Sequence, residues 1–145
     1  MKLKIKRTGY NTNLLLPEYQ TIGAAGFDLQ ANVNALLSNH KAVAIGTGLC
    51  FEIPEGYELQ IRSRSGLALK RGIFVVNAPG TIDSDYRGEM KVILVNLSNE
   101  TQIIEPSERI AQLVIAEYVR ADWQQVEVLS ETKRGAGGFG STGVK

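Results

Sequence analysis

The chain has 145 residues, a formal net charge of +1 and a single cysteine, Cys50. This length fits one domain with a substantial core, and 43% hydrophobic with 21% charged residues is ordinary for a soluble globular protein. A net charge so close to zero excludes a general attraction for nucleic acid, so any phosphate binding must come from locally placed Arg and Lys.

The single cysteine excludes an intrachain disulfide and a cysteine-rich metal cluster, and we expect Cys50 to be a small apolar core residue. No apolar run approaches the roughly 18 residues of a membrane span, and the N-terminus lacks the apolar segment of a signal peptide. The expected location is therefore the cytoplasm, with no membrane partner.

The first half of the chain shows short, strand-like patterns. Residues 2–6 alternate basic and apolar side chains, which predicts a strand with one solvated face, whereas residues 11–19 have no period and predict a loop. Small residues lead into a short predicted strand that carries Asp28, and residues 33–38 favour another strand. Residues 41–53 predict one long strand, or two strands separated at Gly46 and Gly48, where a bend is expected.

The middle of the chain combines the one predicted helix with a loaded loop. Residues 57–62 alternate as a strand, residues 67–71 are predicted to be helical, and Gly72 ends that helix. Apolar residues 73–76 and 90–97 flank residues 77–89, which we predict to be a hairpin with Pro79 and Gly80 at the centre of a turn. Further strands are expected at 102–105 and 109–119. Many short strands separated by turns predict an all-β sandwich or barrel.

From Ser130 the composition changes to a glycine-rich tail, with glycine at 135, 137, 138, 140 and 143. Such a segment cannot hold one conformation by itself, because each glycine loses much backbone entropy on ordering. We therefore expect a core over residues 1–130 and a flexible arm over residues 131–145. The arm is either a disordered terminus or a phosphate-binding lid built on Arg134, Ser141, Thr142 and the ring of Phe139.

Several polar residues elsewhere have both a chemical and a structural interpretation. Arg64, followed by Ser65 and Gly66 at a helix start, could surround a phosphate, or could be a capped helix start with a solvated arginine. Asp83 could be a general base for water or could cap its own turn. Gln112 could touch a ligand or be satisfied by backbone, and Asp28 could hold a local hydrogen-bond network. Together these segments indicate a nucleoside triphosphate site, with the nucleotide left open.

Five segments, in order, carry a resemblance to a known family. They are residues 25–31, 64–68, 77–89, 109–113 and 134–143. With these motifs the chain resembles the trimeric deoxyuridine triphosphate nucleotidohydrolases, the dUTPases, along nearly its full length. The third and fifth motifs are the most specific. Ser107 and Glu108 depart from the Gly-Asp pair expected before the fourth motif, so that turn can differ.

The resemblance implies a jelly-roll-like β-clip fold, a homotrimer with sites at subunit junctions, and Mg²⁺-dependent hydrolysis of dUTP to dUMP and pyrophosphate. Water would attack the α-phosphorus, which lowers dUTP and supplies dUMP for thymidylate synthesis. The third motif of one subunit would hold uracil and deoxyribose, motifs one, two and four of a second would approach the phosphates, and the tail of a third would close the site. The alternatives are a dCTP deaminase of the same fold and a non-catalytic nucleotide-binding trimer.

The resemblance also implies roles for residues. Asp83 is the expected catalytic base, and no direct protein ligand for Mg²⁺ is expected, with Asp28 placed in its second shell. Tyr86 would lie under the sugar and Phe139 would stack on uracil, while Asp85 and Arg87 would hold the hairpin or a subunit contact. The predicted substrate-binding residues are Arg64, Ser65, Gly66, Asn77, Gly80, Thr81, Ile82, Tyr86, Lys91, Gln112, Arg134, Phe139, Gly140, Ser141 and Thr142.

Overall fold

The structure is a computed structural model that describes residues 1–8, 14–141 and 143. Its elements are β1 (Lys4–Arg7), β2 (Gly26–Gln30), β3 (Ala35–Leu37), β4 (Ala42–Gly46), β5 (Leu49–Glu52), β6 (Tyr57–Arg62), α1 (Ser65–Arg71), β7 (Ile73–Val75), β8 (Gly80–Ile82), β9 (Lys91–Asn96), β10 (Gln102–Ile104) and β11 (Arg109–Glu117). The predicted all-β class is thereby confirmed, and among the described residues no helix is long and apolar enough to cross a membrane.

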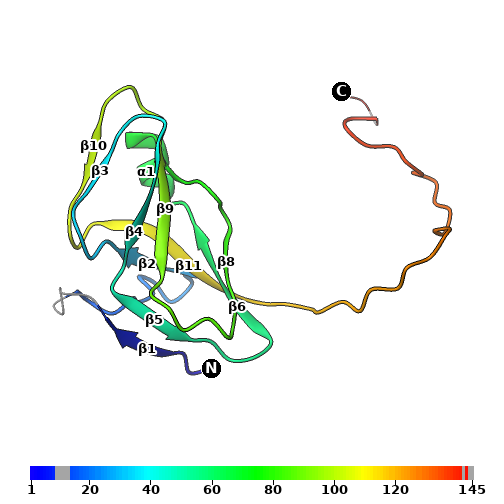
Figure 1. The fold of residues 1–145 in the computed structure, drawn as a ribbon, viewed down its shortest axis with the longest axis horizontal. Coiled ribbons are helices and arrows are strands. Elements are labelled where there is room, and N and C mark those ends of the chain that lie inside the picture. Colours follow the sequence, from blue (N-terminus) through cyan, green and yellow to red (C-terminus); the bar gives the residue numbers. More distant parts are fainter. Residues whose placement is uncertain (9–13, 142, 144–145) are drawn as a thin grey trace.

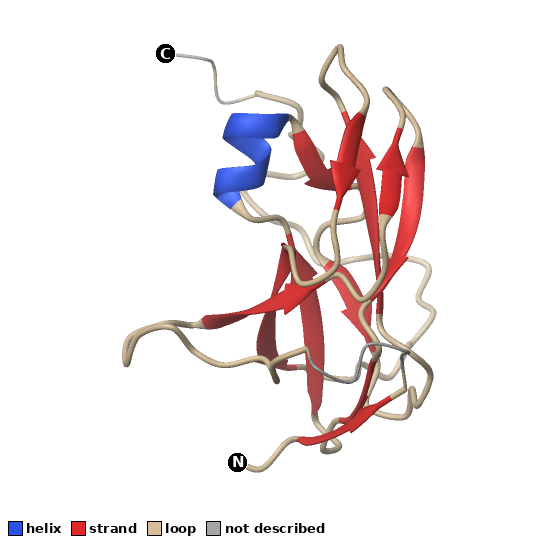
Figure 2. Cartoon of the chain, turned by 90° about the vertical axis from the view of Figure 1, so that its left-hand side faces the viewer, coloured by secondary structure: helices blue, strands red, loops and turns tan. Residues whose placement is uncertain are grey.

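The strands form antiparallel sheets whose order does not follow the chain. One sheet has the order β2-β11-β6-β8 and another β4-β9-β7, while β1 pairs with β5 and β10 with β3. Strand β11 is central, because it pairs with β2 along one edge and with β6 along the other. Figure 2 shows α1 at the end of the molecule opposite the N-terminus. Most contacts thus join segments that are distant in sequence.

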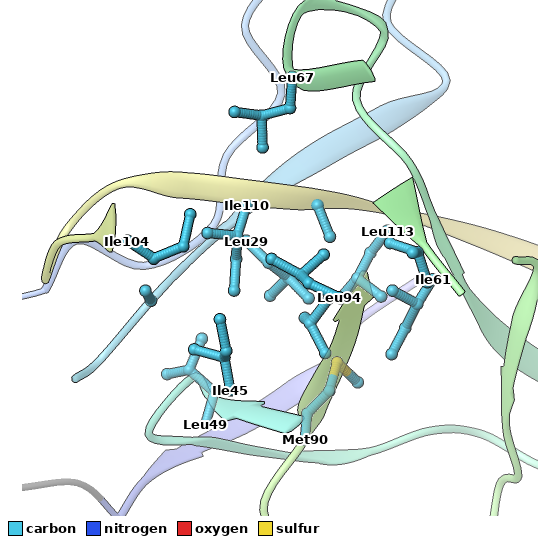
Figure 3. Close-up of a cluster of buried hydrophobic side chains, with 14 of the residues drawn as sticks. Leu29, Ile45, Leu49, Ile61, Leu67, Met90, Leu94, Ile104, Ile110 and Leu113 are labelled. Atoms are coloured by element: carbon cyan, nitrogen blue, oxygen red, sulfur yellow. The ribbon is translucent and has the colours of Figure 1, made fainter. Parts of the chain in front are cut away.

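The core lies between the sheets and is built by alternate residues of each strand. Leu29, Leu94 and Leu113 are fully buried on three different strands, and α1 contributes Leu67 (Figure 3). The burial of alternate residues matches the period of two of a β-strand. Cys50 was expected in this core, but it is only half-buried. Its neighbours Leu49 and Phe51 are buried, so the alternation of β5 turns Cys50 to the opposite face, and that expectation was wrong.

Several boundaries follow the glycines as predicted. The segment 41–53 forms two strands, β4 and β5, and Gly48 between them has φ +67. Helix α1 starts two residues before its predicted start and ends at Gly72, which adopts the left-handed conformation with φ 64. Of the loop predicted at 11–19, residues 11–13 lie outside the described residues, and no strand occurs between 14 and 19.

The segment between β7 and β9 differs from the predicted hairpin. Strands β7 and β9 do pair, but β8 leaves them and pairs with β6, so that Gly80 lies opposite Ile61. Gly80 is a buried strand residue rather than the third residue of a turn, and the Ala78–Pro79 peptide bond is cis. The predicted Pro79-Gly80 turn is therefore wrong, because the free edge of β6 takes this segment as an additional strand. The loop that contains residues 83–89 therefore connects two different sheets, because β8 belongs to one and β9 to the other.

Beyond β11 the chain leaves the sheets and runs outward (Figure 1). Val119, Trp123, Val128 and Leu129 are between 82% and 96% exposed there. Large apolar side chains in water are costly. The segment therefore exposes apolar side chains that no other part of the described chain covers.

Candidate active site

A cavity of about 350 Å³ surrounds the predicted catalytic residue Asp83. Its lining is Ala44, Thr81, Ile82, Asp83, Tyr86, Glu89, Lys91 and Ile93. Strand β8 supplies two of these residues, β9 supplies two more, and the loop between them carries the acid and the aromatic ring. The volume is within the range of small-molecule sites. Five predicted site residues are therefore brought together, and Asp83 is exposed in this setting.

The loop that carries Asp83 is held by its own hydrogen bonds. The Tyr86 N–H donates to the Asp83 carbonyl at 3.2 Å, and the Tyr86 hydroxyl donates to the Glu89 carbonyl at 3.0 Å. Arg87 Nη1 donates to the carbonyls of Ser84 and Tyr86 at 2.6 and 3.0 Å. Arg87 thus holds the loop, as expected. Within the described residues the Asp83 carboxylate forms no ion pair, so it is available to a ligand.

The far end of this loop is fixed to the bend between β4 and β5. The buried Thr47 donates from Oγ1 to the Met90 carbonyl at 2.7 Å, and the Met90 N–H donates to the Leu49 carbonyl at 2.8 Å. The Gly48 N–H donates to Glu89 Oε1 at 2.9 Å. Sequence reasoning missed Thr47 and Glu89, although Gly46 and Gly48 on either side of Thr47 already indicated a bend.

Asn77 and Gly80 lie together at the start of β8. A Cβ atom added to Gly80 would be 3.1 Å from Asn77 Nδ2 and 3.4 Å from Ile61 Cβ. The absence of a side chain at Gly80 therefore allows the Asn77 amide and β6 to approach the backbone closely. Neither residue belongs to the lining of the cavity around Asp83.

A second group of predicted residues lies on β2, on β11 and at the start of α1. Asp28 stands opposite Gln112 in the register of β2 and β11. The Asp28 oxygens form ion pairs with Arg64 Nε at 2.9 Å and with Arg109 Nη1 at 3.1 Å. Arg64 Nη1 also donates to the Arg109 carbonyl at 2.9 Å. Asp28 therefore fixes two arginines side by side, and the local network considered for it is confirmed.

The other members of this group are less constrained. Gln112 Nε2 donates to the Ser63 carbonyl at 3.0 Å, so its amide is partly satisfied by backbone. Ser65 and Gly66 are exposed in the first turn of α1, and the N-cap residue Arg64 makes no side-chain capping bond. The interpretation of Arg64 as a solvated arginine is therefore wrong, because its side chain is mostly buried and binds Asp28.

The glycine-rich tail forms a third group, apart from both others in this chain. Arg134 Nε donates to the Gly137 carbonyl at 2.8 Å, and the Ser141 N–H donates to the Gly138 carbonyl at 3.0 Å. Phe139 is fully exposed, with φ 50, and Gly140 has φ 84. Thr142 lies outside the described residues. The tail is thus a series of tight turns that presents an uncovered aromatic ring.

The fold is similar to that of solved dUTPase structures. The dUTPase of Staphylococcus bacteriophage 80alpha, determined as a mutant with dUpNHpp, is 29% identical, with a TM-score of 0.87 over 99% of both chains. A mutant dUTPase of phage phi11, described with a structural Mg(II) ion, is 24% identical and has a TM-score of 0.80 over 90% of this chain and 100% of that one. These likenesses confirm the predicted jelly-roll-like fold.

The chain is also similar in sequence to curated proteins over nearly its whole length. Deoxyuridine 5'-triphosphate nucleotidohydrolase of Nautilia profundicola is 60% identical over 99% of both chains. The protein of that name from Helicobacter pylori is 48% identical over 99% of this chain and 98% of its own. The family profile described as dUTPase matches residues 12–143. With the five motifs, the cavity around Asp83 and this match over nearly the whole length, the chain belongs to the dUTPase family.

Proposed function

We propose that the protein hydrolyses dUTP to dUMP and pyrophosphate, with Asp83 as the general base for a water molecule that attacks the α-phosphorus. The observation that carries this proposal is the exposed Asp83 carboxylate in a cavity shared with Tyr86 and Lys91. Family membership supplies the substrate class, since the named relatives are dUTP nucleotidohydrolases. The reaction lowers dUTP and yields dUMP, which suits a cytoplasmic protein.

We expect this cavity to bind a uracil nucleotide. Backbone groups of β8 at Thr81 and Ile82 would form one wall of the base site, and the Asn77 amide and Gly80, which lie next to the cavity lining at the start of β8, would extend it. A close wall excludes the extra methyl of thymine, and cytosine would leave polar groups unpaired, which is the stronger basis for discrimination. We place the sugar against the Tyr86 ring, where a 2′-hydroxyl would have no room.

We assign the phosphates to the group around Arg64. Arg64, Ser65, Gly66 and Gln112 would bind the α and β phosphates, and Asp28 would keep the Arg64 guanidinium in place. An arginine that is already oriented loses less entropy on binding a phosphate oxygen. Arg134, Ser141 and Thr142 of the tail would hold the γ end, with Gly140 allowing the turn and Phe139 stacking on uracil.

Mg²⁺ is the metal that we propose for this site. Among the described residues no three His, Cys, Asp or Glu side chains are grouped to hold an ion. Both Asp28 oxygens are engaged by arginines, which leaves this residue an outer position reached through water. A hard ion that keeps its water shell fits such a site, because triphosphate oxygens supply its ligands. Its contribution would be to neutralise charge on the phosphates.

We also propose that the active form is a homotrimer with shared sites. The support is the segment after β11, where Val119, Trp123 and Val128 lie exposed within the described chain. Burial against a neighbouring subunit would stabilise each such side chain by about 1.5–3 kcal/mol. The core 1–130 would then form the trimer, and the arm 131–145 would close a site on another subunit. Residues 122–133 span up to roughly 40 Å when extended, enough for this crossing.

The test is the exchange of the Asp83 carboxylate for an amide. Asp83→Asn should bind dUTP in the presence of Mg²⁺ and lose about 10²- to 10⁴-fold of its pyrophosphate release, the usual contribution of a general base. Asp85→Asn, a second exposed acid in the same loop, is the matched control and should retain turnover. Near-normal pyrophosphate release by Asp83→Asn would refute the assignment.

The two alternatives are distinguished by the same assay. Incubation with each deoxynucleoside triphosphate should give pyrophosphate from dUTP alone and no ammonia from dCTP. Ammonia release from dCTP would identify a deaminase, and binding without any product would identify a nucleotide-binding trimer. The family match disfavours both.

A further inference from the structure

We propose that Glu89 is a positioning residue that fixes the ring of Tyr86 and thereby sharpens discrimination between deoxyribose and ribose triphosphates. This inference rests on the proposed function, because it concerns the same cavity. Glu89 was not among the residues that sequence reasoning assigned to the site. Its position is defined by contacts at both its side chain and its backbone.

The side chain of Glu89 is seated on the bend between β4 and β5. Its Oε1 atom accepts a hydrogen bond from the Gly48 N–H at 2.9 Å. A Cβ atom added to Gly46 would be 2.6 Å from the same oxygen, and the three heavy atoms nearest to it all belong to the Glu89 carboxylate. The carboxylate therefore occupies the space that a side chain at Gly46 would fill. A hydrogen bond to a carboxylate is stronger than one to a neutral acceptor, so this contact holds the Glu89 side chain in place.

The backbone of Glu89 holds the tyrosine. The Tyr86 hydroxyl donates to the Glu89 carbonyl at 3.0 Å, and the next residue, Met90, is fixed by Thr47 and Leu49. A Cβ atom added to Gly88 would be 2.6 Å from Tyr86 Cζ. The ring thus lies over bare Gly88, with its hydroxyl tied to the one carbonyl that the Glu89 side chain anchors.

Tyr86 and Glu89 both line the cavity around Asp83. Tyr86 is 45% exposed and lines the cavity with Asp83 and Lys91, so one side of its ring is open to a ligand. Release of the carboxylate from Gly48 would leave the Glu89 carbonyl held only through the Met90 N–H bond to Leu49, and the ring would be held less firmly against the cavity. A looser ring leaves room for a 2′-hydroxyl. Asp83 lies at the other end of the loop, so the chemical step should be affected less than the recognition of the sugar.

The experiment measures kcat and KM for dUTP and for UTP with the full-length protein. Glu89→Ala should lower the ratio of the two kcat/KM values about tenfold, the effect of losing one hydrogen bond to a charged group. Glu89→Gln keeps an acceptor for Gly48 and should stay within about threefold of the wild type. Glu55→Ala, which removes an exposed glutamate from another turn, is the matched control and should leave the ratio unchanged.

A second variant reaches the same contact from the other side. Gly46→Ala changes no residue of the loop itself, and its added methyl displaces only the end of the Glu89 side chain. It should reproduce the loss of selectivity, and it carries the comparison if Glu89→Ala does not fold. Tyr86→Phe should also lower the ratio, and Glu89→Ala should add little in that background, because both changes act through one hydrogen bond.

Three results would overturn the inference. They are full additivity of Glu89→Ala with Tyr86→Phe, equal losses in Glu89→Gln and Glu89→Ala, and unchanged selectivity in both Glu89→Ala and Gly46→Ala. Equal losses would indicate that the charge of Glu89 acts directly on the substrate. A wild-type protein that releases no pyrophosphate from dUTP would refute the proposed function as well, whereas unchanged selectivity in the variants of an active enzyme refutes this inference alone.

Discussion

Ser107 is strained in the turn before β11, and Ser107→Gly should stabilise the protein. Pro106 and Ser107 are the central residues of a turn in which the Glu108 N–H donates to the Glu105 carbonyl at 3.1 Å. Ser107 has φ 71, the conformation that the third position of a type II turn requires and that glycine adopts without a Cβ clash. The dUTPase pattern places glycine at this position, and the structure gives the physical reason.

The magnitude follows from two opposing terms. A left-handed conformation costs a residue with a Cβ atom about 1–2 kcal/mol. Glycine forfeits about 0.5–1 kcal/mol of this gain, since its unfolded chain has more freedom to lose. The net stabilisation should be about 0.5–1 kcal/mol, which raises Tm by about 2 °C in a protein of this size. The hydrogen bond from the Ser107 N–H to the Ala31 carbonyl, at 2.8 Å, remains in either case.

The assay is thermal unfolding followed by circular dichroism at one protein concentration, which matters because assembly would make Tm depend on concentration. Ser107→Ala is the matched control. It removes the hydroxyl and keeps the Cβ atom, so it should give no stabilisation. If Ser107→Gly were no more stable than Ser107→Ala, the strain assigned to φ 71 would be refuted.

The remaining predictions concern other contacts. Gly72→Ala should destabilise the protein by about 1–2 kcal/mol in urea unfolding, because φ 64 disfavours a Cβ atom; Gly66→Ala, in open space, is its control, and an unchanged midpoint in Gly72→Ala would contradict the argument. Asp28→Ala should lower kcat/KM for dUTP at least about tenfold by releasing Arg64 and Arg109, and the value for Asp28→Asn should lie between those of Asp28→Ala and the wild type. Wild-type activity in Asp28→Ala would contradict the assignment of these arginines to the phosphates. Truncation after Lys133 should preserve assembly in light scattering and abolish most pyrophosphate release, and a fully active truncate would show that the tail is dispensable.

The sequence was sufficient for features that depend on local pattern. Alternation placed most strands, and Gly72 marked the end of the helix because a left-handed C-cap favours glycine. The face of Cys50 was misjudged, because an apolar run does not reveal which of its residues point inward. The partner of β8 was also missed, since pairing of Gly80 with Ile61 joins strands separated by the helix and β7. Such pairings depend on tertiary contacts that no local signal contains.

The candidate site also contains residues that the sequence predicted and residues that it did not. Asp83, Tyr86 and Lys91 were predicted as site residues, and they line one cavity. Thr47 and Glu89 were not predicted, because their role is to fix the loop through contacts with a bend about 40 residues away in the chain. Residues that touch a substrate have recognisable chemistry, whereas residues that position them have only a geometry, which becomes visible when the chain is folded.

The separation of the three groups of predicted residues leads to a last experiment. In this chain the cavity around Asp83, the Arg64 cluster and the tail have no lining residue or hydrogen bond in common among the described residues. If a complete site takes its hairpin and its tail from different subunits, two inactive variants should complement each other. An Asp83→Asn chain supplies an intact tail, and a chain truncated after Lys133 supplies an intact Asp83.

Random mixing of these two variants in equal amounts, by joint refolding, should restore about one quarter of the wild-type sites, because each site draws its acid and its tail independently from two subunits. Each variant refolded alone is the control and should stay inactive. A site contained in one chain predicts no recovery, since every chain in the mixture lacks one of the two parts. Recovery near one quarter therefore requires subunits that exchange their tails, and its absence from well-assembled mixed trimers would refute the shared site while leaving the assignment of Asp83 intact.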